Sequence, residues 1–412
     1  SKVLRKRAIH VWAYAIVVFV VLLLGLFLGE WRPSRKKEIL FLCLSSVVLI
    51  VFSALRATNV GIDYYQFYVP FFENVRSGGW SFLVSDANPY LTEFGFSLLT
   101  FLISLVTGNV FVYMAVIATI MIGLTAWVLY RDCSKPWIGM FIFVAFNFFG
   151  NTLSYIRQSL GIAIFLFAIH YIKEKRIVPY MLLVLLAATF HNSLLLMLPV
   201  YFLAQIAINR ISLGVYGGIT VLVLVFSWQI FNLVTQFVYQ YYATDQNLYF
   251  MQGRDFMTGF IPVLAMVLMI AFQKLLLKKN PRNVVLMNIA MYAGIFFILT
   301  WKHFLFQRIG NIFFTAAILY VPELLTALQA TGTEEEKQRR FLAGKGSWRN
   351  YGYVYGIIAM IILGLIYYFW FIQQNRINLL PFYTVFDEIQ VSALRVQAIT
   401  TTFLNTLVQT FG

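Results

Sequence analysis

The feature that most constrains this fold is a succession of apolar runs, most of them close to the length of a membrane span. A helix of about 20 apolar residues crosses the hydrocarbon core of a bilayer. Such runs lie near residues 10–29, 38–55, 109–130, 136–150, 155–172, 213–240, 257–277, 283–300, 304–325 and 351–372. Hydrophobic residues make up 61% of the chain and charged ones 11%, which leaves little room for a soluble domain. The sequence therefore predicts an all-α, polytopic transmembrane protein with about 10–12 spans.

Two apolar blocks do not fit a single crossing. Residues 94–107 form a run that is short for a span, and residues 177–207 are too long for one crossing yet short for two. His191 and Asn192 interrupt the second block near its middle. A broken helix is tolerated at membrane depth only where the break lines a cavity in the protein. We therefore expect short or broken helices in both blocks, with a polar point at His191.

The net charge of +15 lies largely in short cationic clusters between the apolar runs. Such clusters face the cytoplasm by the positive-inside rule, so membrane topology accounts for the basic balance and no nucleic-acid partner is expected. The clusters are Arg131–Lys135, Lys173–Arg176, Lys274–Arg282 and Lys337–Arg349. The turns between them then face outward, at residues 150–157, 191–193, 241–255 and 301–308. Isolated polar residues thus gather opposite the basic loops.

The topology before residue 108 has two solutions. If residues 94–107 are re-entrant, the loop 56–92 is external, but the basic segment Lys2–Arg7 then lies outside, against the positive-inside rule. If residues 94–107 cross fully, the chain starts inside and the loop is cytoplasmic. Charge counting slightly favours this second solution.

The apolar runs follow one another without a linker or an internal repeat. Residues 1–372 are therefore expected to form a single transmembrane domain. The tail 373–412 is mildly amphipathic, and we expect it to lie along the outer membrane face.

Two arginines lie beside outward-facing helix ends. Arg157 is followed by Gln158 in SYIRQSLGI, and Arg308 is preceded by Gln307 in FLFQRIGN. An arginine near the apolar layer snorkels to the interface, pairs with an internal carboxylate or faces an anion. On a continuous helix Arg157 would share one polar stripe with Asn147, Asn151, Ser154 and Gly161. Two Arg–Gln pairs on one face favour a shared anion site.

Phosphate is the anion that this pattern suits best. The guanidinium fork donates bidentate, charge-assisted hydrogen bonds and keeps its charge at all physiological pH values. No Gly-rich loop with a lysine occurs in the sequence, so a nucleotide site of the P-loop type is not expected. A lipid diphosphate held by side chains at the outer membrane face fits better.

His191 stands alone among apolar residues, where it is either a hydrogen-bonded structural residue or a general base. The loop after the second run carries Arg56, Asp63, Tyr64 and Tyr65, and Glu93 follows it. Aromatic faces with a few carboxylates suit sugar rings, although tyrosines at a membrane interface are also ordinary. The four histidines lack metal-ligand spacing, so no zinc site is expected.

In order along the chain, these motifs resemble those of the EpsG family. The matching segments are RATNVGIDYY from Arg56, EFGF from Glu93, RQSLGIA from Arg157, FHNS from Phe190 and Gln307-Arg308. They lie between residues 10 and 325, where each motif alone is short and their order and spacing together are more specific. In the family the Arg-to-Tyr loop is taken as external, so we adopt the re-entrant solution for residues 94–107.

The resemblance implies a Wzy-type polysaccharide polymerase, a multi-spanning glycosyltransferase of the bacterial plasma membrane with its active site facing the exterior. It would move a growing glycan from undecaprenyl diphosphate onto an incoming lipid-linked repeat unit. Partners would be the lipid-linked oligosaccharide, membrane lipid, and a chain-length regulator and flippase. No metal and no other cofactor is expected, because arginines would take the place of a divalent cation.

The roles that the resemblance implies are these. Arg157 and Arg308 would stabilise the diphosphate, and His191 or Asp63 would deprotonate the acceptor hydroxyl. Arg56 and Glu93 would orient sugar or neighbouring side chains. The other expected substrate-binding residues are Tyr64, Tyr65, Asn151, Gln158 and Gln307.

Two other functions share some of these features. A transporter or flippase of lipid-linked sugars would also use a broken helix and buried cations. Its polar residues would be expected near the membrane centre, whereas here they gather near one face. A membrane-bound acyltransferase would also use a histidine in an apolar helix, but it needs a cytoplasmic donor, and His191 maps to the outer face.

Overall fold

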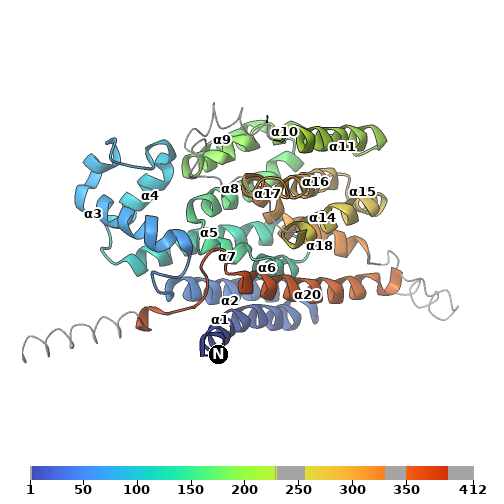
Figure 1. The fold of residues 1–412 in the computed structure, drawn as a ribbon. Coiled ribbons are helices and arrows are strands. Elements are labelled where there is room, and N and C mark those ends of the chain that lie inside the picture. The colour runs from blue at the N-terminus through green and yellow to red at the C-terminus, as the bar shows by residue number, and fades with distance from the viewer. Residues whose placement is uncertain (1, 228, 230–255, 330–348, 388–412) are drawn as a thin grey trace, which may run out of the picture.

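The computed structural model describes residues 2–227, 229, 256–329 and 349–387. The regular secondary structure of this part of the chain is helical, apart from one isolated β-bridge (Figure 1). Within it, six helices are long and apolar enough to cross a membrane, or up to eight if each of two bent helix pairs is one span. Five shorter apolar helices account for further runs of the sequence. The predicted all-α, polytopic fold is confirmed.

The helices of the first third are α1 (Lys2–Leu24), η1 (Gly25–Glu30), α2 (Arg35–Ala54), η2 (Tyr64–Tyr68), α3 (Val69–Leu83), η3 (Leu91–Glu93), α4 (Phe94–Ser104) and α5 (Val110–Asp132). Those of the middle are α6 (Pro136–Ala145), α7 (Phe148–Thr152), α8 (Ile156–Lys173), α9 (Ile177–Phe190), η4 (Asn192–Met197), α10 (Val200–Leu203) and α11 (Arg210–Val225). The last are α14 (Phe256–Ala271), α15 (Gln273–Lys279), α16 (Asn283–Thr300), α17 (Leu305–Thr315), α18 (Ala317–Ala327) and α20 (Arg349–Gln374).

The core lies around α6, α8 and α16. Every residue of α6 is buried, which suits a helix without a single polar side chain. α8 packs against α9, and α16 packs against both α14 and α17. α2 is less enclosed, with 28% of its span window buried against 78% for α16. Apolar side chains on the open face of α2 would contact lipid in a bilayer.

The charged turns gather at one end of the bundle. Lys135 Nζ lies 3.5 Å from Glu30 Oε2, and Arg35 Nη2 donates to the Tyr130 carbonyl at 3.0 Å. Lys279 pairs with Glu323 at 3.0 Å, and Arg282 pairs with Glu174. These contacts join turn 30–37 to turn 130–136 and turn 174–176 to turn 279–283, and Thr326 hydrogen-bonds to both Ser134 and Lys279. We call these four turns the basic end.

This arrangement decides between the two topologies before residue 108. α2 begins at the basic end with Arg35, and α5 ends there beside Tyr130. If residues 94–107 crossed the bundle, Arg35 and Tyr130 would lie at opposite ends. Because these two residues are hydrogen-bonded, the chain between α2 and α5 does not cross the bundle. Helices α3 and α4 therefore lie at the end opposite the basic end, as the re-entrant solution predicts (Figure 1).

Residues 56–92, which were expected to form a loop, contain two helices. No helix was predicted there, but η2 and α3 occupy residues 64–83. Phe71, Phe72 and Val75 are buried, and the Phe72 ring stacks on Tyr113 of α5 at 4.5 Å between centroids. The expectation of a loop was wrong, because apolar residues with a helical spacing form a second small core against α4 and α5.

The block 177–207 is broken as predicted. α9 ends at Phe190, His191 has extended backbone angles, and a 3₁₀ helix follows. The break lies at the end of the bundle opposite the basic end, because α9 starts beside the basic turn 174–176.

After α20 the chain folds back across this same end. Residues 375–387, which we call the C-terminal strap, pair with the 55–62 segment through backbone hydrogen bonds (Figure 1). Gly61 N donates to Asn378 O at 2.9 Å, and Val385 N donates to Leu55 O at 2.8 Å. Residues 388–412 lie outside the described residues, so an interfacial tail stays a prediction there.

Candidate active site

A polar cleft of about 830 Å³ lies at the end of the bundle opposite the basic end. Helices η2, α3, α8 and α17, the loops beside them, the residue after α9 and the C-terminal strap all contribute to its walls. Six residues expected from the sequence line it: Asp63, Glu93, Arg157, Gln158, His191 and Arg308. Residues far apart in the chain therefore meet in one site.

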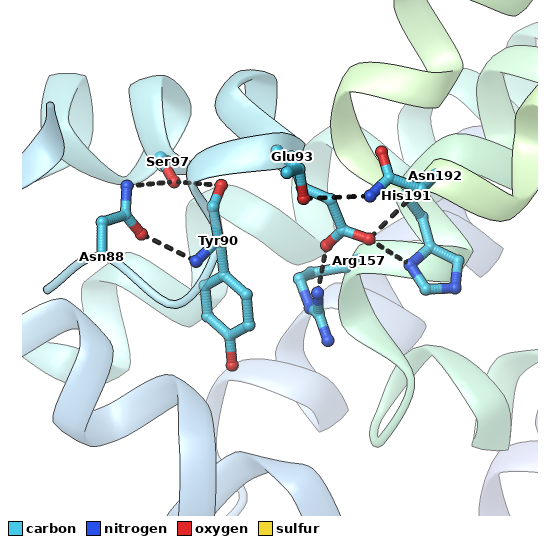
Figure 2. Close-up of polar contacts among 8 residues, drawn as sticks. Asn88, Tyr90, Glu93, Ser97, Arg157, His191 and Asn192 are labelled. Carbon is cyan, nitrogen blue, oxygen red and sulfur yellow. Dashed lines mark hydrogen bonds and ion pairs between the residues drawn. The ribbon is translucent and has the colours of Figure 1, made fainter. Parts of the chain in front are cut away.

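Glu93 lies at the centre of the polar contacts, between Arg157 and His191 (Figure 2). Its Oε2 accepts from Arg157 Nη1. Its Oε1 lies 2.8 Å from His191 Nδ1 and accepts from the Asn192 backbone N–H at 3.1 Å. The Glu93 side chain is 6% exposed, so this carboxylate is well enclosed by its three partners. The contacts fix the His191 ring and the Arg157 guanidinium relative to each other.

Close helix contact brings Glu93 and His191 together. Glu93 ends η3 just before α4, and His191 directly follows the end of α9. A Cβ on Gly95 would lie 2.1 Å from Thr189 Oγ1, so only glycine lets α4 approach α9 this closely. The Glu93-Phe-Gly95 motif thus combines the carboxylate at the centre of these contacts with the residue that permits its position.

Arg157 lies in the first turn of α8, where the helix dipole disfavours a cation. The Glu93 carboxylate offsets this cost. The guanidinium also lies 4.1 Å from the ring centroid of Tyr90, a favourable cation–π contact. These contacts hold Arg157 at the wall of the cleft.

The condition for a polar stripe, one continuous helix from Asn147 to Gly161, is not met. α6 ends at Ala145, Asn147 adopts left-handed angles with φ of 62°, and α8 begins only at Ile156. The short helix α7 therefore separates Asn147 and Asn151 from Arg157. A polar side chain such as asparagine tolerates this backbone conformation better than apolar residues do.

Asp63 reaches the cleft from the loop that follows α2. Gly61 has φ of +99°, and a Cβ there would lie 2.3 Å from the Leu153 carbonyl oxygen. Glycine is therefore required both for the turn and for the contact with the α7–α8 connection. Burial raises the pKa of the Asp63 carboxyl above its usual value, although nearby Arg308 and Arg157 lower it in part. Asp63 is thus close to both arginines.

A narrower inner pocket adjoins the cleft. Gln158 Nε2 donates to the Arg308 carbonyl at 2.9 Å and so ties α8 to α17. Arg308 and Gln158 line both spaces, while Asn151 and Gln307 line the inner pocket but not the outer cleft. Of the three expected amides, only Gln158 therefore lines the outer cleft.

Arg56, Tyr64 and Tyr65 do not line the cleft. Arg56 is fully buried with its guanidinium 4.7 Å from the Tyr64 ring centroid, and burial lowers the pKa of Arg56 to about 10. Its backbone bridges to Thr384 of the C-terminal strap. Tyr65 is 64% exposed on the surface. Their positions suit support of the 56–65 segment more than direct contact with a ligand in the cleft.

Arg376 was not among the residues expected from the sequence, yet it lines both the cleft and the inner pocket. Its only local signal was a cation just after the last apolar run, and such a residue is ordinary at a membrane interface. Tyr68, Tyr90 and Tyr155 also line the cleft.

Within the ranges that the structure describes, no group of three or more His, Cys, Asp or Glu side chains is placed to hold a metal ion. Metal independence remains a prediction that only an activity measurement can test.

The fold and the cleft define a class of protein: a multi-pass helical membrane protein with an arginine-lined polar site at one end of its bundle. Within this class, the chain belongs to the EpsG family, which its residues 39–331 match, and the family is linked to exopolysaccharide biosynthesis. The resemblance expected from the motifs is confirmed. No curated protein and no solved structure matches the chain.

Proposed function

We propose that this protein is a polysaccharide polymerase, which transfers a growing glycan from undecaprenyl diphosphate to a lipid-linked repeat unit. The observation that carries the proposal is the Glu93–His191 contact of 2.8 Å beside Arg157, in a cleft that Asp63 and Arg308 also line. A base, a carboxylate that orients it and cations for a leaving group are the parts that this reaction needs.

In the proposed reaction, the acceptor hydroxyl oxygen attacks the anomeric carbon of the growing chain. The bond from that carbon to the diphosphate oxygen breaks, and its electron pair leaves with the diphosphate. Arg157 and Arg308 lie where they can stabilise this growing negative charge. Guanidinium groups suit the task, because they bind phosphate oxygens in a bidentate manner.

The proton of the acceptor hydroxyl goes to His191 or to Asp63. If Nδ1–H of His191 donates a hydrogen bond to Glu93, the unprotonated Nε2 is free to accept a proton. This is the arrangement in which a carboxylate fixes both the tautomer and the ring. Asp63 is the alternative base, and its raised pKa makes it a stronger proton acceptor than an ordinary aspartate.

The decisive test is incubation of the purified protein with synthetic repeat units linked to a lipid diphosphate. We expect a ladder of polymer and release of the lipid diphosphate, also in the presence of excess chelator. Polymer that disappears with the chelator would contradict metal independence. If no polymer forms but the protein moves lipid-linked units across liposome membranes, the chain is a transporter and the proposal fails.

The proposal also assigns a side of the membrane. Cations at the basic end face the cytoplasm by the positive-inside rule, so the cleft opens to the exterior of the bacterial plasma membrane. Ser77 on α3 and Ser134 beside the basic end are both exposed and suit a labelling test.

In a variant without Cys43 and Cys133, we expect a membrane-impermeant maleimide to label Ser77→Cys in intact spheroplasts. Ser134→Cys should react only after the membrane is permeabilised. Each variant is the control for the other, and the reversed pattern would place the cleft in the cytoplasm and contradict the proposal.

A further inference from the structure

The residues shared by the outer cleft and the inner pocket mark the passage between them. They are Tyr155, Gln158, Phe304, Arg308 and Arg376. Two of these are arginines, and they come from different parts of the chain: Arg308 from α17, and Arg376 from the C-terminal strap. A ligand group at this passage would therefore contact cations from two independent elements.

Defined contacts position Arg376. Its Nη1 donates to Thr258 Oγ1 of α14 at 2.8 Å, and its guanidinium lies 5.5 Å from the Trp370 ring centroid. Thr258 is 1% exposed, so the contact anchors the strap to the interior of the bundle. A cation that is fixed before a ligand arrives loses little conformational freedom on binding.

The residues of the strap that follow Arg376 are themselves fixed, by hydrogen bonds to the 55–62 segment. Ile62 N donates to Ile377 O at 3.0 Å, and Asn378 Nδ2 donates to Asn59 O at 3.1 Å. These bonds join the residues directly after Arg376 to the segment that carries Asp63. The position of the third arginine and the position of Asp63 are thus set by the same contact.

The charges of the cleft also favour an additional role for Arg376. Among the described residues that line it, three are arginines and two are carboxylates. Glu93 binds Arg157 and orients His191, so one of these carboxylates already faces one of the arginines. With Arg376 included, the lining carries net positive charge, and this suits a multiply charged anion better than a neutral sugar.

We propose that Arg376 is a third cation of the anion site, which binds the diphosphate of a lipid-linked substrate together with Arg308. The inference rests on the proposed function for the identity of the ligand. The family match ends at residue 331, so it assigns no role to Arg376. In this arrangement Arg157 acts next to His191, while Arg308 and Arg376 hold the diphosphate at the passage to the inner pocket.

The test is direct binding of farnesyl diphosphate to the purified full chain in detergent. Arg376→Gln is expected to weaken the affinity about tenfold or more, which corresponds to the loss of one charge-assisted contact. Arg376→Lys should recover part of the affinity, because it keeps the charge but not the fork. Farnesol, which lacks the diphosphate, should bind all variants alike.

Arg210→Gln is the matched control, because Arg210 is exposed at the start of α11 and does not line the cleft. Its affinity for farnesyl diphosphate should equal that of the wild type. Thermal melting of each purified variant shows whether it is folded. If Arg376→Gln does not fold, the comparison between Arg376→Lys and the wild type decides, with a loss of affinity expected for the lysine.

Two substrates can supply the diphosphate, and the polymer assay separates them. Weaker binding of farnesyl diphosphate itself marks the site of the leaving group. A raised KM for the lipid-linked repeat unit, with farnesyl diphosphate binding unchanged, marks the site of the acceptor. In either case KM should change more than kcat, because the contact is made before the reaction.

The outcomes separate this inference from the proposed function. Loss of diphosphate affinity in Arg376→Gln supports the inference even if the wild type forms no polymer. If polymer forms and Arg376→Gln leaves both the diphosphate affinity and KM unchanged, the inference is wrong and the polymerase remains. Absence of farnesyl diphosphate and repeat-unit binding by the wild type would also overturn it.

Discussion

Replacement of Arg157 by alanine is expected to stop polymer formation, while the protein stays in the membrane and lipid-linked single repeats accumulate. The reason is the position of its guanidinium, which binds Glu93 beside His191 at the wall of the cleft. Removal of a charge that stabilises a transition state commonly lowers the rate on the order of 10²–10³-fold. Polymer length on gels and the pool of lipid-linked repeats would show the effect.

This substitution also leaves Glu93 without its cationic partner, so a loss of stability has to be separated from a loss of chemistry. An uncompensated buried carboxylate costs about 3–5 kcal/mol. Arg157→Ala combined with Glu93→Gln removes that carboxylate charge, and we expect the double variant to regain thermal stability but no activity. Regained activity would show that Arg157 has only a structural role.

A matched control uses an arginine that also pairs with a glutamate but lies elsewhere. Arg282 binds Glu174 at the basic end, and its side chain is 56% exposed. The Arg282→Ala protein should form polymer of normal length. An exposed ion pair contributes little to stability, and this one is remote from the cleft. Normal polymer length from Arg157→Ala would remove Arg157 from the site.

His191→Ala is expected to lower the rate of polymerisation about 10²-fold or more if His191 is the general base. The protein should still bind farnesyl diphosphate, because the substitution leaves all three cleft-lining arginines among the described residues in place. A rate measured with saturating lipid-linked repeats tests this prediction. An unchanged rate would assign a structural role to His191.

Glu93→Gln distinguishes a positioning residue from a base. If Glu93 acts through the His191 ring, the substitution should lower the rate in the wild type but have no further effect in His191→Ala. Additive losses would indicate an independent role for Glu93.

Asp63→Asn is the corresponding test of the alternative base. Because burial raises the pKa of Asp63, the carboxyl becomes protonated at a higher pH than an ordinary aspartate. If Asp63 is the base, the wild-type rate should fall as pH decreases through that raised pKa, and Asp63→Asn should abolish most of the activity. If His191 is the base, Asp63→Asn should lower the rate of polymerisation less than His191→Ala does.

The spans were predictable because apolar length is a local property of the chain. The run 283–300 coincides with α16, and the run 351–372 lies within α20. The broken block at His191 was also visible, since two polar residues interrupt a long apolar run. By contrast, α3 was missed, because its buried phenylalanines pack against α4 and α5 instead of forming a run long enough to span a membrane.

The residues of the cleft were partly predictable, but their contacts were not. Arg157, His191 and Glu93 each stood out as isolated polar groups, yet nothing in their sequence separations of 64 and 98 residues indicates that one carboxylate binds both. Arg56 and Tyr65 stood out in the same way, but neither belongs to the cleft lining: Arg56 is fully buried, and Tyr65 is exposed on the surface. Polarity selects candidates, but only packing decides which of them meet.

The sequence by itself determined a membrane-embedded helical chain with cations between its spans, because the length of an apolar run and the cost of burying charge depend on neighbouring residues alone. The tertiary structure decided that residues 94–107 return without crossing, since Arg35 and Tyr130 meet at one end. It also decided that Glu93 joins Arg157 to His191, and that the C-terminal strap brings Arg376 to the same cleft. These contacts depend on close approach between helices distant in sequence, which glycines such as Gly95 permit and which no local pattern encodes.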